Sequence, residues 1–99
     1  MILWLSPAET QKRIAEGAKW IDVRDEEESR TNHLHSALLI PLKNLREKAL
    51  ELDKNASYIC YCENGRQSST AAFLLKQMGF NNVSVLRGGL QSLRRAGII

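Results

Sequence analysis

The sequence predicts an α/β domain in which helices cover both faces of a parallel sheet. Short apolar runs alternate along the chain with segments of helical spacing, and this alternation is typical of such sheets. The 99 residues suffice for one domain with a modest core. The proportions of hydrophobic residues (43%) and charged residues (25%) are ordinary for a globular protein. We therefore treat residues 1–99 as a single domain.

Five short apolar runs are the expected strands, and helical patterns separate them. The strands are predicted over residues 3–5, 20–23, 37–40, 57–61 and 83–86. The series Ser6-Pro7-Ala8-Glu9 combines a capping serine, a first-turn proline and a capping-box glutamate, so a helix begins there and ends at Gly17. Further helices are predicted over residues 25–30, 42–52, 67–78 and 90–95. Sites in such sheets form at the carboxyl ends of the strands.

Cysteine content and hydropathy limit the cellular setting. Cys60 and Cys62 are too few and too close for a disulfide framework, which favours a reducing compartment. The apolar start, residues 1–5, has no basic lead and is too short for a signal peptide. No run approaches the roughly 20 apolar residues of a membrane span. We expect a cytoplasmic protein that does not bind membranes.

The positive charge is concentrated in the second half of the chain. The formal net charge is +3. From Cys62 onward, Glu63 is the only acidic side chain, and the basic ones are Arg66, Lys76, Arg87, Arg94 and Arg95. This half would attract a small anion. The basic residues are scattered and lack interleaved aromatic residues, so we do not expect nucleic acid as a partner.

The segment from Tyr58 to Ser68 carries the strongest chemical signal. An apolar strand ends at Cys62, a short loop with Gly65 follows, and a helix starts at once. Unpaired amides and the dipole of the helix N-terminus would favour the thiolate form of the cysteine. Gly65 permits a positive φ angle, and Arg66 adds a cation. This pattern predicts a nucleophile for sulfur or phosphorus, although a cysteine at a strand end is also common as a small buried apolar residue.

Three segments resemble the signature regions of rhodanese domains, in the same order along the chain. They are Ile21-Asp22-Val23-Arg24 followed by His33, Tyr61-Cys62-Glu63-Asn64-Gly65-Arg66-Gln67-Ser68, and Val85-Leu86-Arg87-Gly88-Gly89-Leu90. The resemblance implies a five-stranded parallel sheet flanked by helices. It also implies that Cys62 accepts sulfur and that Glu63, Asn64, Gly65, Arg66, Gln67 and Ser68 cradle the substrate. The implied reaction moves sulfane sulfur from a donor such as thiosulfate to cyanide or a thiol, without metal or organic cofactor.

The chain departs from the family pattern at three places. Many members have arginine where this chain has Gln67, and its own arginine is one position earlier, at Arg66. Residues 32–37 read Asn-His-Leu-His-Ser-Ala in place of a common Gly-His-Ile-Pro-Gly-Ala, and Leu93 replaces a common tryptophan. The first departure concerns donor binding, and the other two concern packing and turn geometry.

Other polar residues have structural interpretations. Asp22 and Arg24 are expected to pair and hold the loops at the sheet edge. His33 is expected to orient a neighbour or to lie on the surface rather than transfer protons. Cys60 and Cys62 are poorly placed for an unstrained disulfide, and we expect no metal between them. Gly88 and Gly89 predict a turn before the last helix.

Two other functions were weighed against sulfur transfer. One is a non-catalytic regulatory or sulfur-sensing rhodanese-like module in a longer chain; the presence of Cys62 argues for catalysis, because inactive versions commonly lack the cysteine. A cysteine phosphatase needs arginine six residues after its nucleophile, where this chain has Ser68. The expected partners are a small anionic sulfur donor and a thiol or cyanide acceptor, with a protein thiol as a further candidate. The sequence carries no signal for an oligomeric state.

Overall fold

A five-stranded sheet forms the centre of the molecule, and every neighbouring pair of its strands is parallel. The computed structural model describes residues 2–99. The strand order is β1-β5-β4-β2-β3. The strands are β1 (Leu3–Leu5), β2 (Lys19–Asp22), β3 (Leu38–Leu39), β4 (Ser57–Tyr61) and β5 (Asn82–Leu86). The predicted fold class is therefore confirmed, with β4 in the middle of the sheet.

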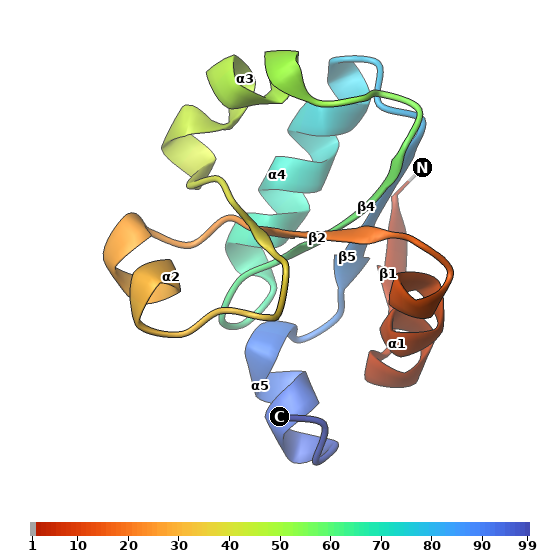
Figure 1. Cartoon of the computed structure of the whole chain (residues 1–99), viewed down its shortest axis with the longest axis vertical. Helices are drawn as coiled ribbons and strands as arrows, with labels where there is room; N and C mark the ends of the chain where they lie inside the picture. Colours follow the sequence, from red (N-terminus) through yellow and green to blue (C-terminus); the bar gives the residue numbers. More distant parts are fainter. Residues whose placement is uncertain (1) are drawn as a thin grey trace.

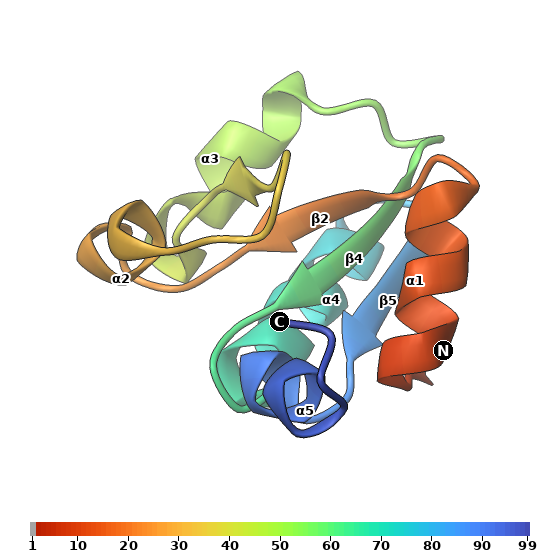
Figure 2. The same ribbon diagram turned by 60° about the horizontal axis from the view of Figure 1, so that its bottom comes forward.

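Helices cover both faces of this sheet. They are α1 (Pro7–Ala15), α2 (Glu26–Thr31), α3 (Leu45–Lys48), α4 (Arg66–Gln77) and α5 (Gly89–Arg95), with 3₁₀ turns η1 (Leu42–Asn44) and η2 (Ala49–Glu51) on either side of α3. Figures 1 and 2 show α3 and α4 on one side of the sheet and α1 with α5 on the other. No helix formed by residues 2–99 is both long and apolar enough to cross a membrane.

The alternation of side chains along β4 divides the core into two clusters. Tyr58, Cys60 and the following Cys62 pack with α3 and α4, whereas Ile59 and Tyr61 pack with α5. Successive side chains of a strand point to opposite faces, so a central strand covered on both sides is apolar throughout. Cys62 therefore belongs to the α4 side of the sheet.

Two predicted elements differ from the structure. The helix expected over residues 42–52 is broken into η1, α3 and η2, because the bonds Asn44 N–H to Pro41 C=O (2.9 Å) and Leu52 N–H to Ala49 C=O (3.1 Å) close three-residue turns. The strand expected over residues 37–40 shortens to Leu38–Leu39, because the Ala37 N–H closes a turn onto the Leu34 carbonyl at 3.1 Å. Both differences lie at the edges of the fold and leave the central strands unchanged.

The N-terminus of α1 has the predicted capping box. The Ser6 hydroxyl accepts the Glu9 N–H at 3.2 Å, and the Glu9 carboxylate accepts the Ser6 N–H at 2.8 Å. Both hydrogen bonds with Ser6 lower the pKa of Glu9, and the bond from the Ser6 backbone N–H has the larger effect. Two N–H groups that the helix itself cannot satisfy are paired in this way.

We predict that Ser6→Ala lowers the free energy of unfolding by about 1 kcal/mol, because the Glu9 N–H loses its acceptor. Glu9→Gln is the matched control, since its amide oxygen can still accept the Ser6 N–H, and it should cost less. Urea unfolding of both variants measures the difference. Equal losses in the two variants would contradict the role given to the serine hydroxyl.

Candidate functional site

The Cys62 sulfur is enclosed by its own loop. Cys62 directly follows β4, and the loop turns back so that the Gly65 N–H donates to Sγ at 3.1 Å. The thiol also contacts the Ser68 hydroxyl at 3.5 Å and the Asn64 side-chain oxygen at 3.9 Å. Ser68 in turn donates to the Gly65 carbonyl at 3.1 Å. Three of the residues expected to form the cradle thus surround the sulfur.

The conformation of Gly65 allows this arrangement. Its φ angle is +96°, a left-handed value, and it is the residue that precedes α4. The Asn64 side chain then accepts the Arg66 N–H at 3.0 Å and pairs one of the first amides of α4. The side chains of Arg66 and Gln67 are exposed at the start of the helix. The loop therefore holds the sulfur at the N-terminus of a twelve-residue helix, where negative charge is favoured.

The two cysteines occupy different environments. Cys60 lies within β4, and burial, together with the nearby Cys62, raises the pKa of its thiol to about 12. Cys62 is also deeply placed, with 1% of its surface exposed, but a backbone N–H donates to its sulfur. A buried thiol without such donors is inert, so only Cys62 has the surroundings of a nucleophile.

Asp22 and Arg24 form a buried ion pair beside this loop. The Arg24 Nη2 and Nε atoms lie 2.8 and 3.1 Å from the Asp22 carboxylate, and the Arg24 backbone N–H donates to it at 3.0 Å. The Tyr61 hydroxyl donates to the same carboxylate at 2.8 Å and accepts the Leu34 N–H at 3.0 Å. The pair therefore joins the carboxyl ends of β2 and β4. The sequence did not predict this role of Tyr61, because Tyr61 and Asp22 are far apart in the chain. A buried tyrosine hydroxyl usually finds a hydrogen-bond partner, and the signal was therefore the tyrosine in an apolar strand.

The loop that contains His33 is attached to this network by its neighbour. Arg24 donates to the Asn32 backbone carbonyl and, at 3.2 Å, to the Asn32 side-chain oxygen. His33 itself is exposed, and its Nδ1 lies 2.7 Å from the Ser29 carbonyl oxygen, to which it must donate. Among residues 2–99, no hydrogen bond joins His33 to Cys62. The structure thus shows His33 bonded to the backbone of α2 and exposed.

The start of α5 lies directly against the Cys62 loop. The Leu90 N–H donates to the Cys62 carbonyl at 2.9 Å, and the Gln91 N–H donates to the Glu63 carbonyl at 3.2 Å. Gly88 and Gly89 form the predicted turn, with φ angles of +77° and +62°. A Cβ on Gly89 would stand 2.5 Å from the Cys62 carbonyl oxygen, so the absence of a side chain allows the contact. The sequence indicated the turn but not this contact.

With this geometry in view, comparison with known proteins identifies the family. The sequence matches the rhodanese-like domain over residues 6–96. The chain belongs to this family.

Two similar proteins of known function are sulfurtransferases. The thiosulfate sulfurtransferase PspE of Escherichia coli is 40% identical over 76 residues, which cover 75% of this chain and 72% of that protein. The tRNA sulfurtransferase of Shewanella amazonensis is 37% identical over 87 residues, or 84% of this chain. This rhodanese-like domain spans 18% of the length of that relative.

Solved structures agree with the fold. A rhodanese-related protein from Thermoplasma volcanium superposes with a TM-score of 0.86 at 30% identity, covering 96% of this chain and 93% of that one. The solution structure of a rhodanese-like domain from an Anabaena protein gives a TM-score of 0.86 at 29% identity, covering 98% and 76%.

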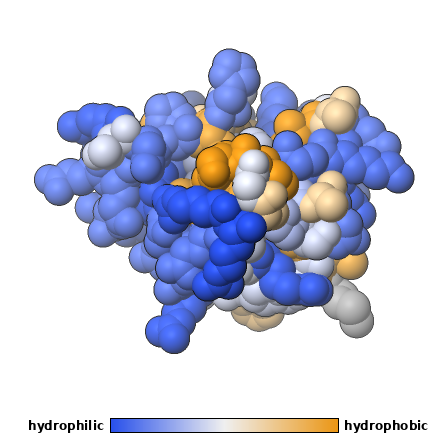
Figure 3. All heavy atoms as spheres, turned by 90° about the horizontal axis from the view of Figure 1, so that it is seen from below, coloured by the Kyte–Doolittle hydropathy of each residue, from blue (hydrophilic) through white to orange (hydrophobic). Residues whose placement is uncertain are grey.

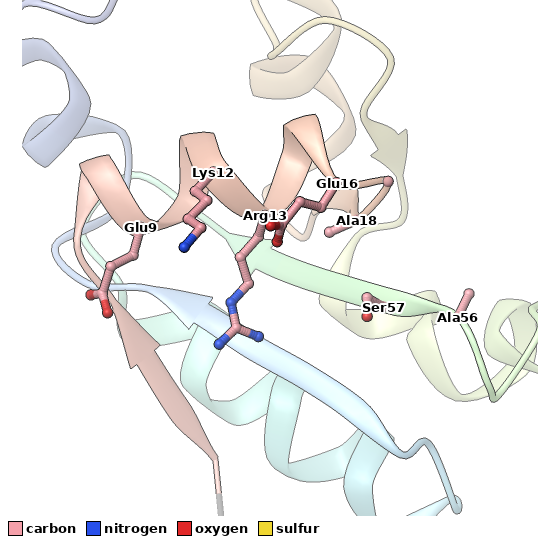
Figure 4. A pocket seen from close by; sticks show the side chains of 8 residues that line it. Glu9, Lys12, Arg13, Glu16, Ala18, Ala56 and Ser57 are labelled. Carbon is pink, nitrogen blue, oxygen red and sulfur yellow. The ribbon is translucent and has the colours of Figure 1, made fainter.

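Two hollows in the surface of this rhodanese-like domain bear on the location of the site. A groove of about 650 Å³ runs beside α1 and reaches the start of β4, and Glu9, Lys12, Arg13 and Glu16 line it from the helix (Figure 4). Ser57 in this groove and Cys62 are separated by the length of β4, roughly 16 Å. The groove is therefore not part of the cysteine site.

A smaller hollow of about 330 Å³ lies at the α5 end of the molecule. Its walls are Asn32, His33, Leu34, Leu90, Arg94 and Ile99. Figure 3 shows this end, where a small apolar patch is surrounded by hydrophilic side chains.

Within residues 2–99, no three His, Cys, Asp or Glu side chains are grouped as a metal site would require.

We predict that Gly89→Ala disrupts the cysteine loop, because the new Cβ would collide with the carbonyl groups of Cys62 and Glu63. Gly97→Ala is the matched control: its φ of +73° imposes similar backbone strain, but a Cβ there meets no atom within 4 Å. The control should lose about 1 kcal/mol of unfolding free energy and Gly89→Ala at least about 2 kcal/mol. Urea unfolding and the alkylation rate of Cys62 check the prediction, which is wrong if the two variants behave alike.

Proposed function

We propose that this rhodanese-like domain is a sulfurtransferase that carries sulfur as a persulfide on Cys62. The sulfane sulfur comes from a small anionic donor such as thiosulfate and passes to a thiol or cyanide. The main support is the Cys62 sulfur itself, which accepts the Gly65 N–H at 3.1 Å at the N-terminus of α4. The similarity to PspE, a thiosulfate sulfurtransferase, agrees with this assignment.

The proposed reaction has two displacements at sulfur. In the first, the Cys62 thiolate attacks the outer sulfur of thiosulfate; the new S–S bond forms as the old one breaks, and sulfite leaves with the electron pair. In the second, cyanide or an acceptor thiolate attacks the outer sulfur of the persulfide and restores the Cys62 thiolate. The products are thiocyanate or a new persulfide, and no external oxidant or reductant is needed.

The loop would serve both displacements in the same way. Cys62 is an anion before the first step, a persulfide between the steps and an anion again after the second. The Gly65 N–H and the free amides at the start of α4 would stabilise that negative charge throughout. The Ser68 hydroxyl, 3.5 Å from the sulfur, could donate to the anion by giving up its hydrogen bond to the Gly65 carbonyl.

A sulfur-binding or regulatory module is the second candidate function. It is favoured by the depth of Cys62, whose exposed fraction of 1% limits access to the sulfur. The tRNA sulfurtransferase of Shewanella amazonensis also shows that a similar segment occurs within a much longer protein. A sensing module would take up sulfur once, whereas an enzyme would turn over repeatedly with cyanide or a thiol as acceptor.

We predict that thiosulfate adds one sulfur, about 32 Da, to Cys62, and that cyanide removes it. Mass spectrometry of the digested protein locates the sulfur, and thiocyanate formation over many turnovers distinguishes the enzyme from the sensor. Cys62→Ser should abolish both the addition of sulfur and the formation of thiocyanate. Added mass on Cys60 would refute the assignment, and a single stoichiometric release of sulfur would favour the sensor.

We predict that Cys60 is not alkylated by iodoacetamide at pH 8 while the protein is folded. With a pKa of about 12, its thiolate fraction at that pH is about 10⁻⁴. Cys62 should be the labelled residue, and Cys60→Ser should leave the labelling rate unchanged. Rapid labelling of Cys60 in the native protein would contradict the difference between the two environments.

We predict that Arg66→Ala raises the KM for thiosulfate about fivefold and changes kcat little, because the exposed guanidinium would meet the dianion before sulfur transfer. Gln67→Arg, which restores the arginine common in the family, should give equal or higher activity. Steady-state kinetics of the two variants tests this. An unchanged KM in Arg66→Ala would mean that the backbone amides alone hold the donor.

A further inference from the structure

Glu63 is an unfavourable neighbour for the proposed chemistry. It directly follows Cys62, and no other aspartate or glutamate occurs between Cys62 and residue 99. Its side chain is 38% exposed, so its charge is only partly screened by water. A carboxylate on the residue next to a thiolate would repel both that thiolate and an incoming anionic donor. The structure must compensate this charge for an anion to approach.

Arg94 provides the compensation from a distant part of the sequence. Its guanidinium pairs with the Glu63 carboxylate through both Nη atoms, the Nη2 to Oε1 distance being 3.4 Å. Arg24 lies farther away, with its Nη1 4.0 Å from Oε1, and is already bound to Asp22. Arg94 is therefore the main counter-ion of Glu63.

The position of Arg94 on α5 follows from the backbone contacts of that helix. Residues four apart lie on the same helical face, so Arg94 stands one turn beyond Leu90, whose N–H binds the Cys62 carbonyl. The Gln91 N–H binds the carbonyl of Glu63 itself. The first turn of α5 thus holds the backbone of the loop, and its last turn holds the Glu63 side chain.

We propose that Arg94 is a positioning residue of the Cys62 site: by pairing with Glu63 it cancels the one negative charge in the loop and so permits an anion to reach the sulfur. It acts through Glu63 and does not bind the donor. This inference rests on the proposed function where it concerns thiosulfate, but its electrostatic part concerns any anion that reacts at Cys62.

The first test uses alkylation and needs no sulfurtransferase activity. The rate ratio for Cys62 with iodoacetate, an anion, and iodoacetamide, its neutral analogue, reports the local potential while it cancels changes in thiol reactivity. Arg94→Gln should lower this ratio about threefold. The double variant Glu63→Gln with Arg94→Gln should return it to the wild-type value, since the loop is again neutral. Circular dichroism and thermal unfolding confirm that each variant is folded.

Arg95→Gln is the matched control for this test. Arg95 is the next residue of α5 and is equally charged, but within residues 2–99 it forms no ion pair with Glu63. Its removal should leave the alkylation ratio unchanged within about 1.5-fold. If Arg95→Gln and Arg94→Gln changed the ratio equally, the change would follow from the loss of net charge alone. The specific role of the ion pair would then be overturned.

The second test uses steady-state kinetics with thiosulfate. Because the donor has two negative charges, Arg94→Gln should raise its KM about tenfold, the square of the effect on iodoacetate, with kcat little changed. The increase should shrink at high ionic strength and disappear in the double variant. A double variant as impaired as Arg94→Gln would mean that Arg94 binds the donor directly, and the proposal would be wrong. If the wild-type protein transfers no sulfur, the proposed function fails while the alkylation ratio still decides the role of Arg94.

Discussion

The buried contact between Asp22 and Arg24 determines where the rest of the site can lie. Removing two charges from water costs several kcal/mol, and only complete hydrogen bonding offsets this. Here the Asp22 carboxylate receives the Arg24 backbone N–H, the Arg24 guanidinium and the Tyr61 hydroxyl. Burial alone would lower the pKa of Arg24, but hydrogen bonding to Asp22 and its charge more than compensate, so the pKa is raised. Because Tyr61 ends β4, the residue that follows it, Cys62, is fixed relative to β2.

The contact with α5 then holds the backbone of the Cys62 loop. The carbonyls of Cys62 and Glu63 both point to α5, where the Leu90 and Gln91 N–H groups bind them. In a planar trans peptide the N–H points opposite to the carbonyl, so the amides after these two carbonyls are directed away from α5. The Cys62 side chain itself packs on the other side of the sheet, with residues of α4. The position of the loop backbone thus depends on a helix more than twenty residues later in the chain.

The parts of the structure that could be predicted are those with local causes. The capping box at Ser6, the left-handed Gly65 and the apolar run of β4 each depend on a few adjacent residues, and all were indicated by the sequence. The contacts that were missed join distant segments: Tyr61 with Asp22, and Glu63 with Arg94 across 31 positions. Hydropathy and spacing describe neighbours along the chain and cannot report which charged side chains meet at a sheet edge. The resemblance to rhodanese domains supplied the order of the motifs but not these chain-specific pairs.

The charges around Cys62 show why a single exposed arginine can matter at this site. Asp22 pairs with Arg24, and Glu63 pairs with Arg94, so these four charged side chains form two neutral pairs. Arg66 begins α4 and has no ion pair among residues 2–99. Neutral pairs produce fields that fall off quickly, whereas an unpaired charge acts over about 8 Å at physiological salt. Under the proposed function, an approaching anion would meet the unpaired charge of Arg66, whereas the charge of the buried Arg24 is already neutralised by Asp22. With glutamine at position 67, the proposed attraction of the donor would rest on the residue before it, Arg66.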